Sequence, residues 1–216
     1  MRRDILTSIL AVLAMTVVFG VAYPLLVTGA AQVAFPERAN GSLVHRGGRV
    51  VGSRLIGQDF RVQASGKNGR LLVDPGKRPV MWPVPRYFQE RPSTQTSYDA
   101  DATAFTNLGP NSKDARDSFR SNLRSYLSLE RPYDRGLTAA EVPIDAVTSS
   151  ASGIDPQISQ ANARIQAHRV AALRHLPLST VDALIRRHTD GRFAGVFGEP
   201  GVNVLELNLE LDRLRE

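Results

Sequence analysis

Residues Ile5–Val27 read ILTSILAVLAMTVVFGVAYPLLV, and no charged residue occurs between Ile5 and Pro36. A helix needs about 20 mainly apolar residues to cross about 30 Å of hydrocarbon, and this stretch is long enough. The hydroxyls of Thr7, Ser8 and Thr16 can bond to helix carbonyls, so they do not argue against a membrane helix. Pro24 lies near the far end, where a kink or the end of the helix is tolerated. The stretch therefore predicts one transmembrane helix.

A cleaved signal peptide is the alternative interpretation of the same residues. Arg2 and Arg3 would form its basic start, and Thr28-Gly29-Ala30 would be a passable cleavage site. The apolar part of a signal peptide usually spans only about 7–15 residues, which is shorter than this stretch. The length favours a retained anchor.

The basic residues in front of the helix predict its orientation. Arg2, Arg3 and the terminal amine precede the apolar stretch directly, and such charges stay in the cytoplasm. We therefore expect a single-pass membrane protein with a cytoplasmic N-terminus and an extracytoplasmic body. Long domains translocate largely regardless of charge, so the basic body is weak evidence against this topology.

Composition excludes several classes of function. The 216 residues carry a formal net charge of +6, but the basic residues are scattered and only 6% of residues are aromatic. Nucleic-acid binding by stacking needs basic residues interleaved with aromatics, so no nucleic-acid partner is predicted. The absence of cysteine excludes disulfides and thiol chemistry. A basic surface near anionic lipid or an acidic partner explains the charge.

The rest of the chain predicts a mixed α+β domain, with short strands followed by helices. We expect residues 1–32 to form the cytoplasmic N-terminus and membrane helix, and residues 33–216 to form a single soluble domain. Leu43-Val44 and Val50-Val51 flank two glycines, which predicts a hairpin, and Leu55-Ile56 is a candidate short strand. The Gly-, Pro- and Lys-rich residues 64–85 predict a surface loop.

Helices are predicted in the second half of the chain. Ser112 is the expected N-cap of a helix of about 18 residues. A second helix begins at Asp155-Pro156 or at Ser159, and a third begins after Pro177, with Ser179 and Asp182 as a capping box. The C-terminal leucines alternate as in a strand, yet Asn203 and Glu206 have capping spacing, which favours a helix.

No catalytic or metal-binding constellation is apparent. A phosphate-binding loop would require glycine at position 61, where Arg61 stands, and the motifs HExxH and GxSxG are absent. Asp99 and Asp101 are typical of a solvated loop. His168 and His175, seven residues apart, lack an acidic companion and are interpreted as surface or helix-end residues. No catalytic residue and no metal ligand is predicted.

Short segments along nearly the whole chain resemble a known family, and they follow one another in the order that the family has. They resemble the C subunit of the Kdp-type bacterial potassium-transporting P-type ATPase (the KdpC family). The matching segments are Tyr23-Pro24-Leu25-Leu26, Ala39-Asn40-Gly41-Ser42-Leu43, Gly52-Ser53-Arg54-Leu55-Ile56-Gly57-Gln58, Tyr87-Phe88-Gln89-Glu90-Arg91-Pro92-Ser93, Asn107-Leu108-Gly109-Pro110, Ser150-Ala151-Ser152-Gly153-Ile154-Asp155-Pro156-Gln157-Ile158-Ser159 and Val202-Asn203-Val204-Leu205-Glu206-Leu207-Asn208-Leu209. Residues 66–85 interrupt the resemblance as an inserted loop.

The resemblance implies a non-catalytic accessory subunit of a high-affinity potassium transporter. Its implied partners are a potassium-channel-like subunit, a P-type ATP-hydrolysing subunit and the lipid bilayer. The family is described as promoting ATP binding by the hydrolysing subunit, with a glutamine in contact with the nucleotide. On this basis Gln166, with Ser152 and Gly153, is the candidate ATP site, and ATP is shared with the hydrolysing subunit.

The predicted topology conflicts with that site, because ATP is cytoplasmic and the body is expected outside. An effect on ATP would then pass through the membrane helix, where Gly20, Ala22, Gly29 and Ala30 allow close packing on a partner. Two other classes remain: a membrane-tethered extracytoplasmic enzyme, and a membrane-tethered binding or structural domain unrelated to ATP.

Overall fold

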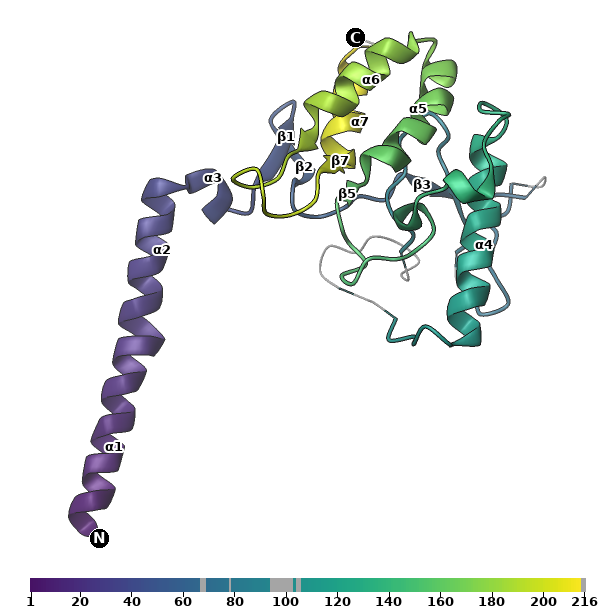
Figure 1. The fold of residues 1–216 in the computed structure, drawn as a ribbon. Helices are drawn as coiled ribbons and strands as arrows, with labels where there is room; N and C mark the ends of the chain where they lie inside the picture. Colours follow the sequence, from purple (N-terminus) through teal and green to yellow (C-terminus); the bar gives the residue numbers. More distant parts are fainter. Residues whose placement is uncertain (67–68, 78, 94–102, 104–105, 215–216) are drawn as a thin grey trace. The chain divides into compact units, whose positions relative to one another are not determined.

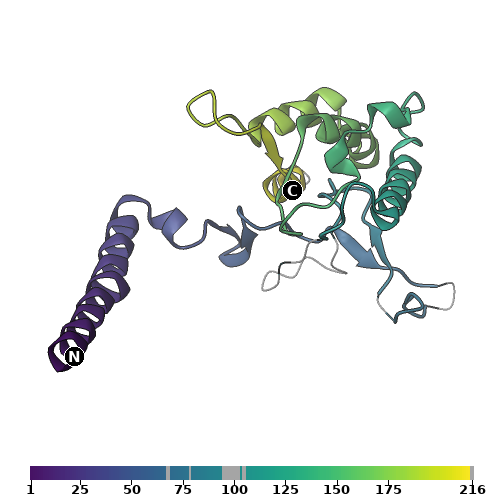
Figure 2. The same ribbon diagram turned by 60° about the horizontal axis from the view of Figure 1, so that its bottom comes forward.

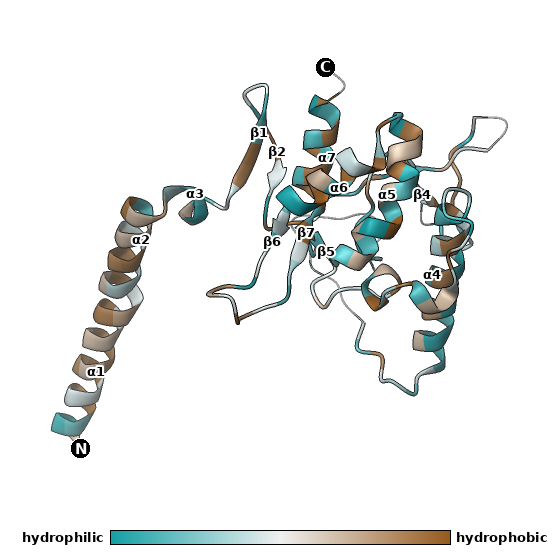
Figure 3. Cartoon of the chain, turned by 45° about the horizontal axis from the view of Figure 1, so that its top comes forward, coloured by the Kyte–Doolittle hydropathy of each residue, from teal (hydrophilic) through white to brown (hydrophobic). Residues whose placement is uncertain are grey.

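A single long apolar helix begins the computed structural model, which describes residues 1–66, 69–77, 79–93, 103 and 106–214 (Figure 1). It consists of α1 (Arg2–Val17), a π-helical turn (Val18–Ala22) and α2 (Tyr23–Ala34), and none of its residues is buried in the chain. Figure 3 shows by its colours that most residues of this helix are hydrophobic. The predicted membrane helix is confirmed as a helix long and apolar enough to cross a bilayer.

The helix does not end at its proline. Pro24 lacks the N–H that would close an α-helical turn, and the π-helical turn directly before Tyr23 accommodates this loss. The 33 residues of Arg2–Ala34 span about 50 Å at ~1.5 Å per residue, more than the hydrocarbon thickness of about 30 Å. One end of the helix therefore extends beyond the hydrocarbon or the helix tilts.

The chain divides into two compact units, Met1–Ser53 and Arg54–Glu216. The first unit ends with α3 (Pro36–Ala39) and the antiparallel hairpin of β1 (Leu43–Arg46) and β2 (Arg49–Ser53). Gly47 and Gly48 form its turn with φ of +56° and +77°, values that glycine adopts without steric cost. The predicted hairpin is confirmed.

The second unit begins with two departures from the prediction. Leu55 lies in a turn and Ile56 makes an isolated bridge, so the strand expected there is wrong. The predicted loop is partly wrong as well, because β3 (Arg61–Gln63) pairs with β4 (Met81–Pro83). Strands of three residues are too short to show alternation, and their pairing is decided across the intervening chain.

Four helices follow, and three of the predicted caps are present. They are α4 (Lys113–Glu130), α5 (Gln160–Arg174), α6 (Leu178–Arg187) and α7 (Val204–Arg213). The side chains of Ser112, Ser159 and Asn203 accept hydrogen bonds from the first turns of α4, α5 and α7 at 3.1–3.4 Å. Short 3₁₀ turns, Ala139–Glu141 and Ile144–Ala146, connect α4 to the next elements.

The capping box predicted for α6 is wrong. The helix begins at Leu178 with Pro177 as its N-cap, so Ser179 already lies inside the first turn. Proline sets φ near the helical value and has no N–H to satisfy, so it can start the helix without a side-chain cap.

A small antiparallel sheet joins the helices, and the sequence did not predict it. Its order is β5 (Gln157–Ile158), β7 (Gly201–Asn203) and β6 (Thr189–Asp190), with Val202 opposite both Ile158 and Thr189. Figure 2 shows β7 leading directly into α7. The hydrophobic core forms here, between the sheet, α5, α6, α7 and the buried ring of Phe88. The predicted α+β class, with one membrane helix before a mixed domain, is confirmed.

Candidate functional site

Tyr87–Ser93 is an irregular segment of the second unit that bonds to several of its buried polar side chains. Phe88 is fully buried, yet the segment belongs to no strand or helix. Buried backbone N–H and C=O groups need partners, and a segment outside a sheet must find them among side chains. We call Tyr87–Ser93 the central segment.

Two amide side chains hold consecutive residues of the central segment. Asn208 of α7 accepts from the N–H of Phe88 at 2.9 Å and donates to its carbonyl at 3.0 Å. Gln166 of α5 accepts from the N–H of Gln89 at 2.7 Å and donates to its carbonyl at 3.0 Å. Each amide thus provides one donor and one acceptor, as a neighbouring strand would.

Gln166 belongs to a buried polar stripe on α5. Asn162, Gln166 and Arg169 lie four and three residues apart, which places them on one helix face, and all three are buried. Gln166 donates to Asn162 Oδ1 at 3.0 Å and accepts from Arg169 Nη2 at 2.9 Å. Tyr126 donates its hydroxyl to Asn162 Oδ1 at 2.8 Å, and burial is the main cause that raises the pKa of this tyrosine.

At the end of the stripe lies a buried ion pair. Arg169 and Glu130 have side chains exposed by only 0% and 1%, and Arg169 Nε donates to both carboxylate oxygens at 3.0 Å. The same guanidinium donates to the carbonyls of Pro85 and Tyr87. Burial raises the pKa of Glu130, and the charge of Arg169 opposes that effect. Removing either partner would leave a buried charge unpaired.

The other end of the central segment contacts the loop Ser149–Asp155. Arg91 donates to the carbonyl of Ser149 at 3.1 Å and pairs with Asp155 at 3.2 Å, while Ser93 donates to the carbonyl of Gly153 at 3.0 Å. Within the loop, Gly153 has φ of +75° and its N–H donates to Ser150 Oγ at 2.8 Å. The loop therefore follows the central segment rather than opening toward a phosphate.

Two of the three predicted nucleotide residues thus contact the central segment, at separate places. Gln166 binds the central segment at Gln89, and Gly153 binds it at Ser93. Gln166 is 1% exposed, and its two acceptor sites and two N–H groups are all used within the protein. Ser152 accepts from the N–H of Ile154 at 3.3 Å. Direct contact of these residues with ATP stays a prediction.

Glu90 in the central segment has an unusual environment. Its Oε1 accepts from the N–H of Gln58 at 2.9 Å, whereas its buried Oε2 has no partner among the described residues. Burial raises the pKa of Glu90 well above the ordinary value, and the charges of Asp155 and Asp59 add to this. The residue borders a cavity of about 220 Å³, whose lining also includes Arg61.

Replacing Glu90 with glutamine is expected to make the stability less sensitive to pH. A raised pKa means that the folded state binds the proton more tightly than the unfolded chain. The stabilisation is therefore complete below the ordinary pKa and is lost as the pH rises through the folded-state pKa. Glutamine cannot lose a proton, so E90Q should gain stability over the native chain as the pH rises from about 4 to about 8.

Urea midpoints across this pH range would measure the difference. E141Q is the control with the opposite sign, because hydrogen bonds from Thr138 lower the pKa of exposed Glu141. Its stability should fall slightly relative to the native chain as the pH rises. Parallel curves for E90Q and the native chain would show that Glu90 keeps an ordinary pKa.

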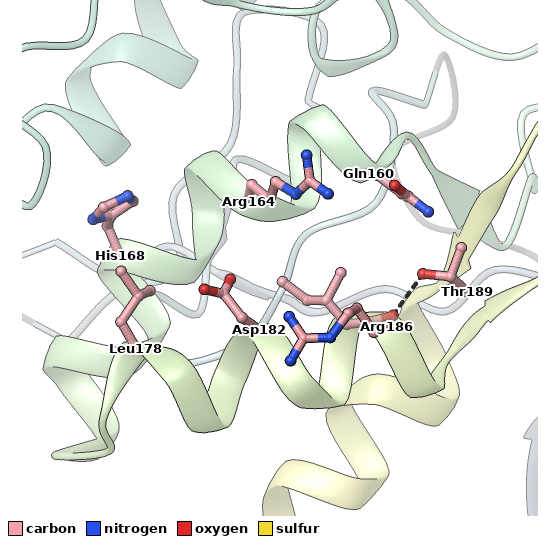
Figure 4. Close-up of a pocket in the computed structure, with 8 residues that line it drawn as sticks. Gln160, Arg164, His168, Leu178, Asp182, Arg186 and Thr189 are labelled. Carbon is pink, nitrogen blue, oxygen red and sulfur yellow. Dashed lines mark hydrogen bonds between the residues drawn. The ribbon is translucent and has the colours of Figure 1, made fainter.

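A second concave surface lies between α5 and α6. Figure 4 shows Arg164 and His168 from α5 beside Asp182 and Arg186 from α6. The groove has a volume of about 240 Å³, and none of the predicted nucleotide residues lines it. His168 is exposed and His175 caps the end of α5 with φ of +56°, which confirms the interpretation of these histidines as surface or helix-end residues.

Metal-binding side chains do not gather in the described part of the chain, where no three His, Asp or Glu residues form a group able to hold an ion. Asp99 and Asp101 lie outside the described residues, as do residues 67, 68 and 78 of the predicted insertion. The residues that sequence reasoning missed are Glu130, Asn162, Arg169 and Asn208. The spacing of Asn162 and Arg169 places them on one face of α5, which is a signal in the sequence. A polar stripe on a helix, however, ordinarily indicates a solvent-facing surface.

Known proteins are similar to this chain over both of its compact units. The family model described as "KdpC: K+-transporting ATPase, c chain" matches residues 5–213. A "Potassium-transporting ATPase KdpC subunit" of Methylococcus capsulatus (strain ATCC 33009 / NCIMB 11132 / Bath) is 43% identical over 210 residues, which are 96% of this chain and 96% of the relative. The protein of that name in Mycobacterium tuberculosis (strain ATCC 25618 / H37Rv) is 40% identical over 216 residues, 99% of this chain and 100% of the relative.

A third relative with the same name, from Koribacter versatilis (strain Ellin345), is 39% identical over 213 residues, which are 98% of this chain and 95% of the relative. The family-model match over residues 5–213 includes the apolar helix from Ile5 onward, the central segment and α7. The chain belongs to the KdpC family, the c chain of potassium-transporting ATPases.

Proposed function

We propose that this chain is a non-catalytic accessory subunit of a high-affinity, ATP-driven potassium transport complex, which assists assembly and promotes ATP binding by the hydrolysing subunit. The observation that carries the proposal is the family match over residues 5–213, because it includes the apolar helix as well as the body. The partners proposed are a channel-like potassium subunit and a P-type ATP-hydrolysing subunit, together with the bilayer.

The apolar helix is the proposed route of assembly. It buries none of its residues within this chain, so its surface is available for lipid and partner helices. Gly20, Ala22, Gly29 and Ala30 are small, and a Cβ added at Gly29 would meet no atom within 4 Å. Small residues let helix backbones approach closely in lipid, where van der Waals packing drives association.

The effect on ATP is proposed to pass through the membrane assembly. Arg2 and Arg3 favour a cytoplasmic N-terminus and therefore an extracytoplasmic body, away from ATP. A direct contact through Gln166 would also break its bonds to Gln89, Asn162 and Arg169. Direct binding of ATP by Gln166, Ser152 and Gly153 is the alternative within this proposal.

Purification of the transport complex tests the accessory role. With an affinity tag on this chain, two larger membrane proteins should copurify with it. A complex prepared without the chain should show a higher KM for ATP or fail to assemble. Recovery of the tagged chain alone, with unchanged ATPase kinetics in its absence, would leave a structural domain unrelated to ATP.

Cysteine labelling tests the topology. The chain has no cysteine, so S65C and S128C each provide a single thiol at an exposed position of the body. We expect a membrane-impermeant maleimide to label both variants in intact cells. Labelling only after the cells are opened would reverse the orientation and make direct ATP binding by the body the leading mechanism.

A further inference from the structure

The loop between β6 and β7 exposes three large apolar side chains. Phe193 is 79% exposed, and Val196 and Phe197 are each 67% exposed. We call these three residues the apolar tip. They lie within five residues of one another, and they are the three most exposed large apolar side chains among the described residues of the second unit. Single exposed apolar residues are ordinary on protein surfaces, but a cluster of this kind marks an interaction site.

The backbone holds the apolar tip in this exposed arrangement. The N–H of Phe193 donates to the carbonyl of Phe197 at 2.8 Å, and the N–H of Phe197 donates back at 3.0 Å. Gly195 takes φ of +77° in the turn between them. On either side of the turn in the sequence, Arg192 and Glu199 form an ion pair at 3.0 Å. The loop is therefore a closed hairpin that presents its side chains outward.

The size of the apolar tip favours lipid over a protein partner. An aromatic side chain buries roughly 150–250 Å², so Phe193 and Phe197, at 79% and 67% exposure, together offer about 220–370 Å², and Val196 adds less than one ring. A protein of a stable complex usually contributes about 800 Å² of complementary surface. Insertion between lipids requires no complementary surface, and aromatic and aliphatic side chains beside an arginine are typical of interfacial membrane sites.

The membrane helix belongs to the same chain, so it tethers the body to a bilayer. A tether converts the second contact into an intramolecular event with a high effective concentration, so a weak site suffices. We propose that the apolar tip, Phe193, Val196 and Phe197, inserts into the headgroup region of the bilayer and gives the body a second membrane contact.

A fluorescent reporter at the tip tests this proposal on the full chain. The variant V196C, labelled with an environment-sensitive dye, is reconstituted into vesicles of phosphatidylethanolamine and phosphatidylglycerol. We expect blue-shifted emission and quenching by lipids that carry a nitroxide near the headgroup. Adding F193S and F197S to V196C should abolish both signals without lowering the unfolding midpoint, because both rings lie outside the core.

Labelled S128C, on exposed α4, is the matched control and should show neither signal. Tip emission that stays unshifted in vesicles would overturn the proposal. A blue shift that requires the partner subunits and is insensitive to the quencher would also overturn it, since it would identify a protein contact. Neither result would affect the accessory role, which depends on copurification and ATP kinetics.

Discussion

Replacing Arg169 with methionine should lower the free energy of unfolding of the body by about 3–5 kcal/mol, the cost of leaving one partner of a buried ion pair alone. Glu130 would keep a buried carboxylate without its guanidinium, which donates to it at 3.0 Å. The carbonyls of Pro85 and Tyr87 would lose a donor as well. Urea unfolding of the full chain in micelles, followed by circular dichroism, measures the change.

The matched control is R187A, which removes an arginine from a pair whose guanidinium side is 67% exposed. Exposed ion pairs contribute about 0–1 kcal/mol, so its midpoint should barely move. Combining R169M with E130L should recover part of the loss, because no unpaired charge remains. A loss in R169M as small as that in R187A would show that the pair is solvated in solution.

Replacing Asn208 with leucine should lower the free energy of unfolding by about 2–6 kcal/mol, since each of two buried groups left without a partner costs about 1–3 kcal/mol. The two groups are the N–H and the carbonyl of Phe88, which both bond to the Asn208 amide. Leucine has a similar volume, so the loss reports hydrogen bonds more than packing. The same urea experiment gives the value.

N111L, at an exposed turn position, is the control for the chemical change from asparagine to leucine and should be nearly neutral. If N208L were equally neutral, the central segment would not depend on its amide contacts. In that case the structural role of Gln166, which holds Gln89 in the same manner, would lose its main support.

The variant N208L also serves as a control in any test of nucleotide binding by Gln166. A Gln166 variant removes the bonds to Gln89 and Arg169 at once, so it should be unstable whether or not Gln166 meets ATP. N208L disturbs the same segment from α7 without touching a predicted nucleotide residue. A rise in the KM for ATP that is equal in Q166L and N208L would indicate a structural effect, and a rise in Q166L alone would favour direct contact.

Local sequence determined the elements whose signals are local. The apolar stretch Ile5–Val27 is sufficient for the long helix, because backbone groups in lipid must be satisfied within the segment. The side chains of the caps Ser112, Ser159 and Asn203 accept from N–H groups three residues away, so these caps could be recognised directly from the sequence. Gly47-Gly48 similarly determined the first hairpin.

Contacts between distant residues were decided only by the tertiary structure. The strands β5, β6 and β7 are two or three residues long, which is too short for an alternating pattern to predict them, and their paired residues lie 11 to 46 positions apart in the sequence.

The same reason explains the candidate site. Asn162, Gln166 and Arg169 form a polar stripe, which by itself predicts a solvated helix face. Burial of that stripe became favourable only because residues far away in the sequence supply its hydrogen-bond partners. These partners are the central segment, Pro85, Tyr126, Asp145 and Glu130, which is 39 residues from Arg169. The sequence shows which polar side chains need hydrogen-bond partners, whereas the tertiary structure decides whether water or other protein groups provide those partners.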